Sequence, residues 1–183
     1  MTITLDDYEY VREHVRQVPD FPKKGILFLD ITTATKDAKA FQKSMNFLYE
    51  QFKDKNIDYV AGIESRGFIF GAALASKLDI GFIPIRKPNK LPADTIKETY
   101  DLEYGSDTIE MHKDAVKNGD RVLIIDDLLA TGGTAVAACN LVKKAGAQVV
   151  ATAFIIELDP LKGREKIEAK GVDVVSMLHY DLD

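Results

Sequence analysis

The sequence predicts an α/β protein whose mostly parallel, twisted sheet is flanked by helices. Short apolar segments alternate with longer segments in which apolar residues recur at helical spacing. This alternation is typical of units in which a helix joins two parallel strands. The clearest strand covers residues 122–125, four branched apolar residues in a row. Such a run indicates a strand that is buried on both faces, as in a parallel sheet.

The other elements follow from the same patterns. Asp37 is expected to cap a long amphipathic helix that buries Phe41, Met45 and Leu48. Residues 86–108 show no sustained period, and an irregular segment of this length is usually functional or disordered. A hairpin of residues 99–102 and 108–111 could form within it. Helices are predicted at residues 6–18, 37–53, 68–77, 113–117, 135–145 and 163–170, and further strands at 25–31, 59–63, 81–85, 149–156 and 172–178.

Composition limits the possible classes of protein. The 183 residues suffice for one domain, and 46% hydrophobic and 29% charged residues are ordinary for a globular protein. A net charge of −5 argues against nucleic acid as a partner. No apolar run approaches the roughly 20 residues of a membrane span, so no membrane partner is expected. The single Cys139 excludes an internal disulfide, which together with the polar N-terminus predicts a cytoplasmic location.

A turn rich in glycine and threonine follows the buried strand and precedes an Ala-rich helix. Glycines let backbone N–H groups approach an anion closely, threonine hydroxyls add donors, and the helix N-terminus adds partial positive charge. The spacing is not that of a Walker nucleotide site. The turn that we expect to hold a phosphate consists of Ala130, Thr131, Gly132, Gly133 and Thr134.

Two neighbouring carboxylates, Asp126 and Asp127, separate the strand from this turn. Adjacent like charges repel each other, so the pair makes sense where it accepts hydrogen bonds from a vicinal diol, with a divalent cation nearby. A phosphate turn beside a diol acceptor describes a site for a ribose 5-phosphate. The alternative is a helix-capping turn with solvated aspartates.

Two further groups are candidates for anion binding. Ser65 and Arg66 follow another predicted buried strand, so their turn should lie at the same sheet edge and suit a pyrophosphate. A plain capping turn is the alternative. The cations Arg86, Lys87 and Lys90 follow the next strand and could hold phosphates in this site or a neighbouring subunit's site. A solvated loop is the alternative there.

The strand, the acidic pair and the turn resemble the phosphoribosyl pyrophosphate (PRPP) motif of the type I phosphoribosyltransferases. Other segments, in the same order along nearly the whole chain, resemble the adenine phosphoribosyltransferase family. The resemblance implies one domain over residues 1–183, with an N-terminal hood of about residues 1–35 and a mobile lid hairpin of about residues 91–110. The segments that carry it are residues 21–22, 25–28, 64–68, 86–87, 102–105 and 161–166.

The resemblance also implies roles. Leu27 would bind adenine through its backbone and Phe28 would stack on it. Arg66 would be catalytic between base and pyrophosphate, and Glu103, beside Tyr104 on the lid, would manage the proton on the purine ring. PRPP would bring Mg²⁺ close to the acidic pair. The substrates would be adenine and PRPP, the products AMP and pyrophosphate, and the enzyme a homodimer.

One position departs from the family pattern. Leu29 stands where the family has arginine, which removes a cation that Lys23 or Lys24 could replace. Two other functions stay open. One is the same reaction on a 6-oxopurine such as guanine or hypoxanthine. The other is a PRPP-sensing regulator that binds nucleic acid, which the acidic composition and single-domain length disfavour.

Overall fold

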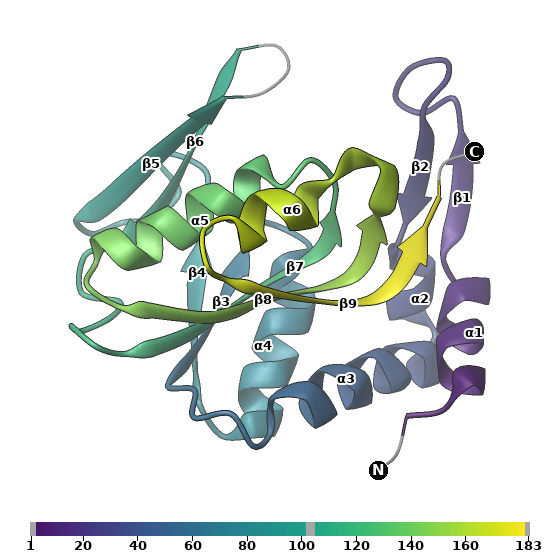
Figure 1. Ribbon diagram of the computed structural model, residues 1–183, viewed down its shortest axis with the longest axis horizontal. Helices are drawn as coiled ribbons and strands as arrows, with labels where there is room; N and C mark the ends of the chain where they lie inside the picture. Colours follow the sequence, from purple (N-terminus) through teal and green to yellow (C-terminus); the bar gives the residue numbers. More distant parts are fainter. Residues whose placement is uncertain (1–2, 102–104, 182–183) are drawn as a thin grey trace.

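A computed structural model describes residues 3–101 and 105–181, and Figure 1 shows the arrangement of the elements. In this part of the chain, five parallel strands form the main sheet in the order β4-β3-β7-β8-β9. The central strand is therefore the one that precedes the Gly/Thr turn. The strands are β3 (Tyr59–Ile63), β4 (Gly81–Ile85), β7 (Arg121–Leu129), β8 (Gln148–Leu158) and β9 (Asp173–Tyr180).

Helices cover both faces of this sheet, as the sequence predicts (Figure 1). α3 (Ala38–Phe52) and α4 (Gly67–Leu78) pack on one face, and α5 (Gly133–Lys144) and α6 (Gly163–Glu168) pack on the other. Side chains of β7 alternate between the two cores. Leu123 and Ile125 enter the first core, Val122 and Ile124 enter the second, and all four are fully buried. The prediction of a strand buried on both faces is confirmed.

The N-terminal region differs from the prediction. The first helix, α1, is short (Leu5–Glu13), and the residues expected to extend it instead form β1 (Arg16–Pro19). β1 pairs antiparallel with β2 (Leu27–Asp30), so its backbone groups are satisfied by the ladder instead of by hydrogen bonds within a helix. A short helix that the sequence did not indicate, α2 (Thr32–Lys36), follows this hairpin.

A second hairpin, β5 (Thr95–Asp101) and β6 (Ser106–His112), is longer than predicted. The middle of β5 is attached to α5, because Glu98 accepts a hydrogen bond from Asn140 at 3.0 Å and pairs with Lys144. The two hairpins stand at opposite ends of the molecule in Figure 1.

The remaining differences are small. Residues 113–117 form turns rather than the predicted helix. A 3-10 turn (Asp159–Leu161) precedes α6. None of the helices in the described part of the chain combines the length and apolar character that a membrane crossing requires.

Candidate active site

The structure brings the two predicted turns together at one edge of the sheet. β3 and β7 are parallel neighbours whose pairing ends at Gly62 and Ile125, so the turn after β3 lies beside the acidic pair of β7. Gly67, at the start of α4, packs directly against the middle of β7. A Cβ there would lie 2.7 Å from the Ile125 carbonyl oxygen and 3.0 Å from Asp126 Oδ1. Only glycine permits this approach, which sets the Ser65-Arg66 turn against the acidic pair.

The Gly/Thr turn forms a small pocket of about 80 Å³. Gly132 has a left-handed backbone, with φ of +78°, and caps the N-terminus of α5. The helix therefore directs its positive end toward the pocket. The pocket is lined by Asp126, Leu128, Leu129, Ala130, Thr131, Gly132, Gly133, Thr134, Ala135 and Phe154. These properties suit a phosphate group.

In the acidic pair, Asp127 is buried and Asp126 is half-buried. Asp127 is 3% exposed, and its backbone N–H donates to Asp126 Oδ1 at 2.8 Å. Burial, and to a smaller extent repulsion from Asp127, raises the pKa of Asp126 well above its ordinary value. Burial also raises the pKa of Asp127, although the Arg66 guanidinium opposes this rise. Fully solvated aspartates therefore do not describe this pair. β7 continues through the pair to Leu129, so the strand is longer than its apolar run.

Arg66 connects this pair to the N-terminal hairpin. Its Nε lies 2.6 Å from Asp127 Oδ2 in an ion pair. No described residue gives that oxygen an aligned hydrogen bond. The guanidinium also lies over the Phe28 ring, 5.6 Å from its centroid, and Phe21 packs edge-on against the same ring at 5.1 Å. Next to Phe28 is the half-buried Leu27. In space, the Phe28 ring is thus followed by the Arg66 guanidinium and then by the two carboxylates.

The basic cluster is not the solvated loop of the alternative interpretation. Arg86 donates two hydrogen bonds to Glu64, both at 3.1 Å, and lowers the pKa of that carboxyl. The Lys87 backbone N–H also donates to Glu64, at 3.0 Å, while its ammonium pairs with Asp107. The exposed Lys90 contributes its carbonyl oxygen to Arg86. Charge on Arg86 is therefore already balanced within the protein.

Other predicted residues differ in where they lie. Ser65 is exposed at the tip of its turn. Leu29 is 2% exposed and belongs to the core, so its side chain lies away from the solvent-facing site. The loop lysines Lys23 and Lys24 are exposed. The two lid residues, Glu103 and Tyr104, lie outside the described residues.

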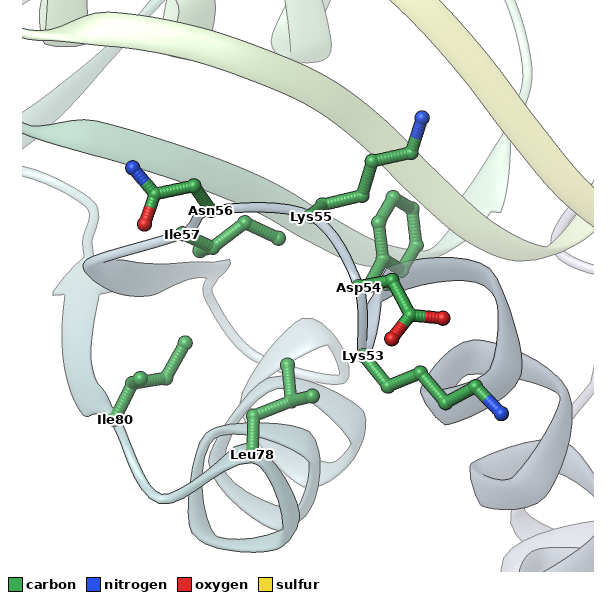
Figure 2. Close-up of a pocket in the computed structure, with 8 residues that line it drawn as sticks. Lys53, Asp54, Lys55, Asn56, Ile57, Leu78 and Ile80 are labelled. Carbon is green, nitrogen blue, oxygen red and sulfur yellow. The ribbon is translucent and has the colours of Figure 1, made fainter.

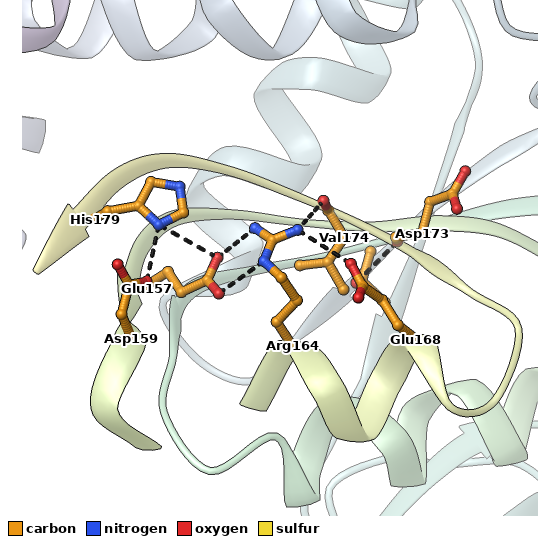
Figure 3. Close-up of polar contacts among 8 residues, drawn as sticks. Glu157, Asp159, Arg164, Glu168, Asp173, Val174 and His179 are labelled. Carbon is orange, nitrogen blue, oxygen red and sulfur yellow. Dashed lines mark hydrogen bonds and ion pairs between the residues drawn. The ribbon is translucent and has the colours of Figure 1, made fainter. Parts of the chain in front are cut away.

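Sequence reasoning missed how α6 supports the phosphate turn. Gly163 packs against Gly132 and the Ala130 carbonyl oxygen. Arg164 fixes the helix by donating to Glu157 at 2.9 and 2.5 Å and to the Val174 carbonyl oxygen at 2.7 Å (Figure 3). The only sequence signal was the resemblance over residues 161–166.

The same region contains a potential cation ligand set. Glu157, Asp159 and His179 bring ligand atoms within 4.8 Å of one another. Arg164 already pairs with both Glu157 oxygens, however, so this is an ion-pair network (Figure 3). A larger cavity, about 390 Å³, lies at the other sheet edge, before β3 and β4, and contains no predicted site residue (Figure 2).

Comparisons with known proteins identify the family of this chain. A family model described as a phosphoribosyl transferase domain matches residues 31–181. The adenine phosphoribosyltransferase of Koribacter versatilis is 56% identical over 174 residues, 95% of this chain and 94% of that protein. This chain belongs to the adenine phosphoribosyltransferase family.

Solved structures of the family have the same fold. The adenine phosphoribosyltransferase of Rhodothermus marinus has a TM-score of 0.91 and 49% identity, covering 97% of this chain and 100% of its own. The Saccharomyces cerevisiae enzyme, solved with adenine and an imino-altritol bisphosphate, has a TM-score of 0.89 and 41% identity. That match covers 96% of this chain and 100% of the yeast chain. The predicted fold and family are confirmed.

Proposed function

We propose that this enzyme transfers the 5-phosphoribosyl group from PRPP to adenine, producing AMP and pyrophosphate. The observation that carries the proposal is the position of Arg66, between the Phe28 ring and the buried Asp127. A base stacked on Phe28 and a ribose held by the acidic pair would meet beside this one cation. The base would attack the anomeric carbon of PRPP and displace pyrophosphate, which joins the base to the ribose.

The residues suggest how the reaction proceeds. Bond breaking at the anomeric carbon passes through a ribosyl cation-like state, as in glycoside chemistry. The enzyme needs no nucleophile of its own, because adenine attacks. Asp126 and Asp127 accept hydrogen bonds from the ribose hydroxyls, and the N-terminus of α5 holds the 5-phosphate. Arg66 balances charge on the departing pyrophosphate. This arrangement fixes the reacting carbon relative to the base.

The lid supplies the remaining roles in this proposal. Glu103 hydrogen-bonds to one imidazole nitrogen of adenine, and accepts or returns its proton, while the other imidazole nitrogen attacks PRPP. Tyr104 helps to enclose the substrates. Closure excludes water, which would otherwise hydrolyse PRPP.

Mg²⁺ fits this site. Carboxylate oxygens are its preferred protein ligands, and the buried Asp127 Oδ2 has an ion pair with Arg66 but no aligned hydrogen bond from any described residue. Asp126 and Asp127 would lie close to an Mg²⁺ ion that enters with PRPP. When bound, the ion supplies positive charge to the pyrophosphate.

An assay of AMP formation from adenine, PRPP and Mg²⁺ tests the function. We expect AMP and pyrophosphate in equal amounts, with guanine and hypoxanthine much poorer substrates. A faster reaction with guanine or hypoxanthine would show that this base, and not adenine, is the preferred substrate. PRPP binding without any product would favour the regulator instead.

The proposal includes a cytoplasmic homodimer. The support for a dimer is the family membership and the basic cluster after β4, which could serve a neighbouring site. Light scattering at working concentrations should give twice the 20.3 kDa chain mass. A monomer that is fully active would contradict a shared site.

A further inference from the structure

The hydroxyl of Tyr100, on β5, is a common partner for three side chains. Thr134, in the phosphate turn, donates to it at 3.0 Å, and the Lys87 ammonium lies 3.4 Å away. The Tyr100 hydroxyl itself donates to Asp107 Oδ2 at 3.3 Å. Its single hydrogen and its lone pairs are therefore all used. These four residues form a chain from the phosphate turn to the lid hairpin.

Asp107 is the anionic end of this chain and the direct partner of Lys87. The two side chains form an ion pair and are 31% and 40% exposed, respectively. Lys87 also lies over the Tyr100 ring, 5.9 Å from its centroid. An ammonium has three N–H groups, and the described contacts engage two of them. One N–H is left for a ligand.

The hairpin that bears Asp107 and Tyr100 is attached to the helix that begins at the phosphate turn. Glu98, two residues before Tyr100, is bound by Asn140 and Lys144 of α5. The separation between the Lys87 ammonium and the phosphate turn is therefore set by short contacts on both sides. A free lysine would instead lose rotamer entropy when a ligand fixed it.

We propose that Asp107 is a positioning residue for the pyrophosphate of PRPP, acting through Lys87, while Tyr100 sets the distance from Lys87 to Thr134. This inference rests on the proposed function. A carboxylate near a polyanion is repulsive by itself, so it belongs here only if holding Lys87 in place outweighs that repulsion. No other described residue pairs with the Lys87 ammonium as an anion.

The pH dependence follows from the same contacts. Burial tends to lower the pKa of Lys87, but the hydrogen bond to Asp107 and the nearby Tyr100 raise it overall. The other charged groups at this position are Glu64, which accepts the Lys87 backbone N–H, and its partner Arg86. Without the Asp107 carboxylate, less opposes the lowering of the Lys87 pKa by burial, so Lys87 loses its proton at a lower pH.

Asp107→Asn keeps the size of the side chain and removes its charge. We expect the KM for PRPP to rise about 3–10-fold with kcat within about twofold, because only a preorganised contact is lost. The alkaline limb of kcat/KM should move to lower pH. Thr99→Val is the matched control, because it removes the exposed hydrogen bond to Thr108 on the same hairpin and should change neither quantity.

A double-mutant cycle separates positioning from general damage. Lys87→Met should raise the KM for PRPP, and adding Asp107→Asn to it should cause little further change. An unchanged or lower KM in Asp107→Asn, or full additivity in the double variant, would overturn the inference alone. Absence of AMP formation by the unmodified chain would overturn the proposed function and the inference with it.

Discussion

Gly132 and Gly163 meet backbone to backbone beneath the phosphate turn, in a space too narrow for any side chain. A Cβ on Gly132 would lie 2.7 Å from the Gly163 carbonyl oxygen and 3.0 Å from its Cα. A Cβ on Gly163 would in turn lie 2.8 Å from Leu129 Cδ1 and 3.0 Å from the Gly132 nitrogen. The position of the turn therefore depends on α6, thirty residues further along the chain.

Gly132→Ala should displace the turn and weaken PRPP binding by about 10–100-fold, since a misplacement near 1 Å has effects of this size. Calorimetric titration with PRPP measures the change. Gly171→Ala is the matched control, because φ there is +71° and a Cβ would meet nothing within 4 Å. That variant carries backbone strain of about 1–2 kcal/mol without a clash. Equal losses of PRPP affinity in Gly132→Ala and Gly171→Ala would show that backbone strain, and not the clash with Gly163, causes the effect.

Asp126→Ala and Asp127→Ala should each weaken PRPP binding by roughly 1–3 kcal/mol, because each removes an acceptor for a ribose hydroxyl. Binding is measured by the same titration. Asp114→Ala, at an exposed position, is the control. If both active-site variants bound PRPP as the unmodified chain does, the ribose would have to lie elsewhere.

Glu103→Leu should lower kcat by roughly 10²–10⁴-fold while PRPP binding changes little, because the proton interaction strengthens in the transition state. Single-turnover rates isolate the chemical step. Asp101→Asn, two residues earlier, should change the rate little. Near-normal chemistry in Glu103→Leu would contradict the assignment, as would an equal loss in Asp101→Asn.

Asp30 should make the hood sensitive to acid. Hydrogen bonds from the Thr32 hydroxyl and then from Arg16 lower the pKa of its carboxyl to about 2 in the folded protein. A lowered pKa stabilises the fold above the unfolded pKa, near 4, and this contribution disappears as the pH falls toward 2. Asp30→Asn should lower the free energy of unfolding by about 1–2 kcal/mol at pH 7. In urea titrations the difference should vanish near pH 2, and a constant difference would contradict the assignment.

The main sheet was predictable because its signals are local. The run at residues 122–125, the cap at Asp37 and the periodicity of α3 act over a few residues, and each is found in the structure. β1 was not predictable in this way. Its residues fit the end of a helix, and only pairing with β2, across a loop, makes a strand the better state.

In the site, too, local sequence signals were predictive and contacts between distant segments were not. Both turns could be placed at one edge from strand order alone, because parallel strands bring their carboxyl ends together. Arg86 was expected to bind substrate, but its pairing with Glu64 depends on the registry of β3 and β4. The contacts of Tyr100 with Thr134 and Asp107 join segments that carry no shared sequence signal. Such contacts depend on side-chain packing and had to be observed.

The contrast between β7 and the lid hairpin predicts a hierarchy in amide hydrogen exchange. Backbone N–H groups of β7 lie between two strands and two cores, so they should exchange only when the whole domain unfolds. Apart from one bridge between Glu110 and Arg86, the described part of the β5–β6 hairpin pairs only with itself, so its amides away from that bridge should exchange through local opening. Asp126 and Asp127 would then lie on the slowest-exchanging strand. The described hairpin residues that lie away from the bridge would belong to a faster-opening unit of the same domain.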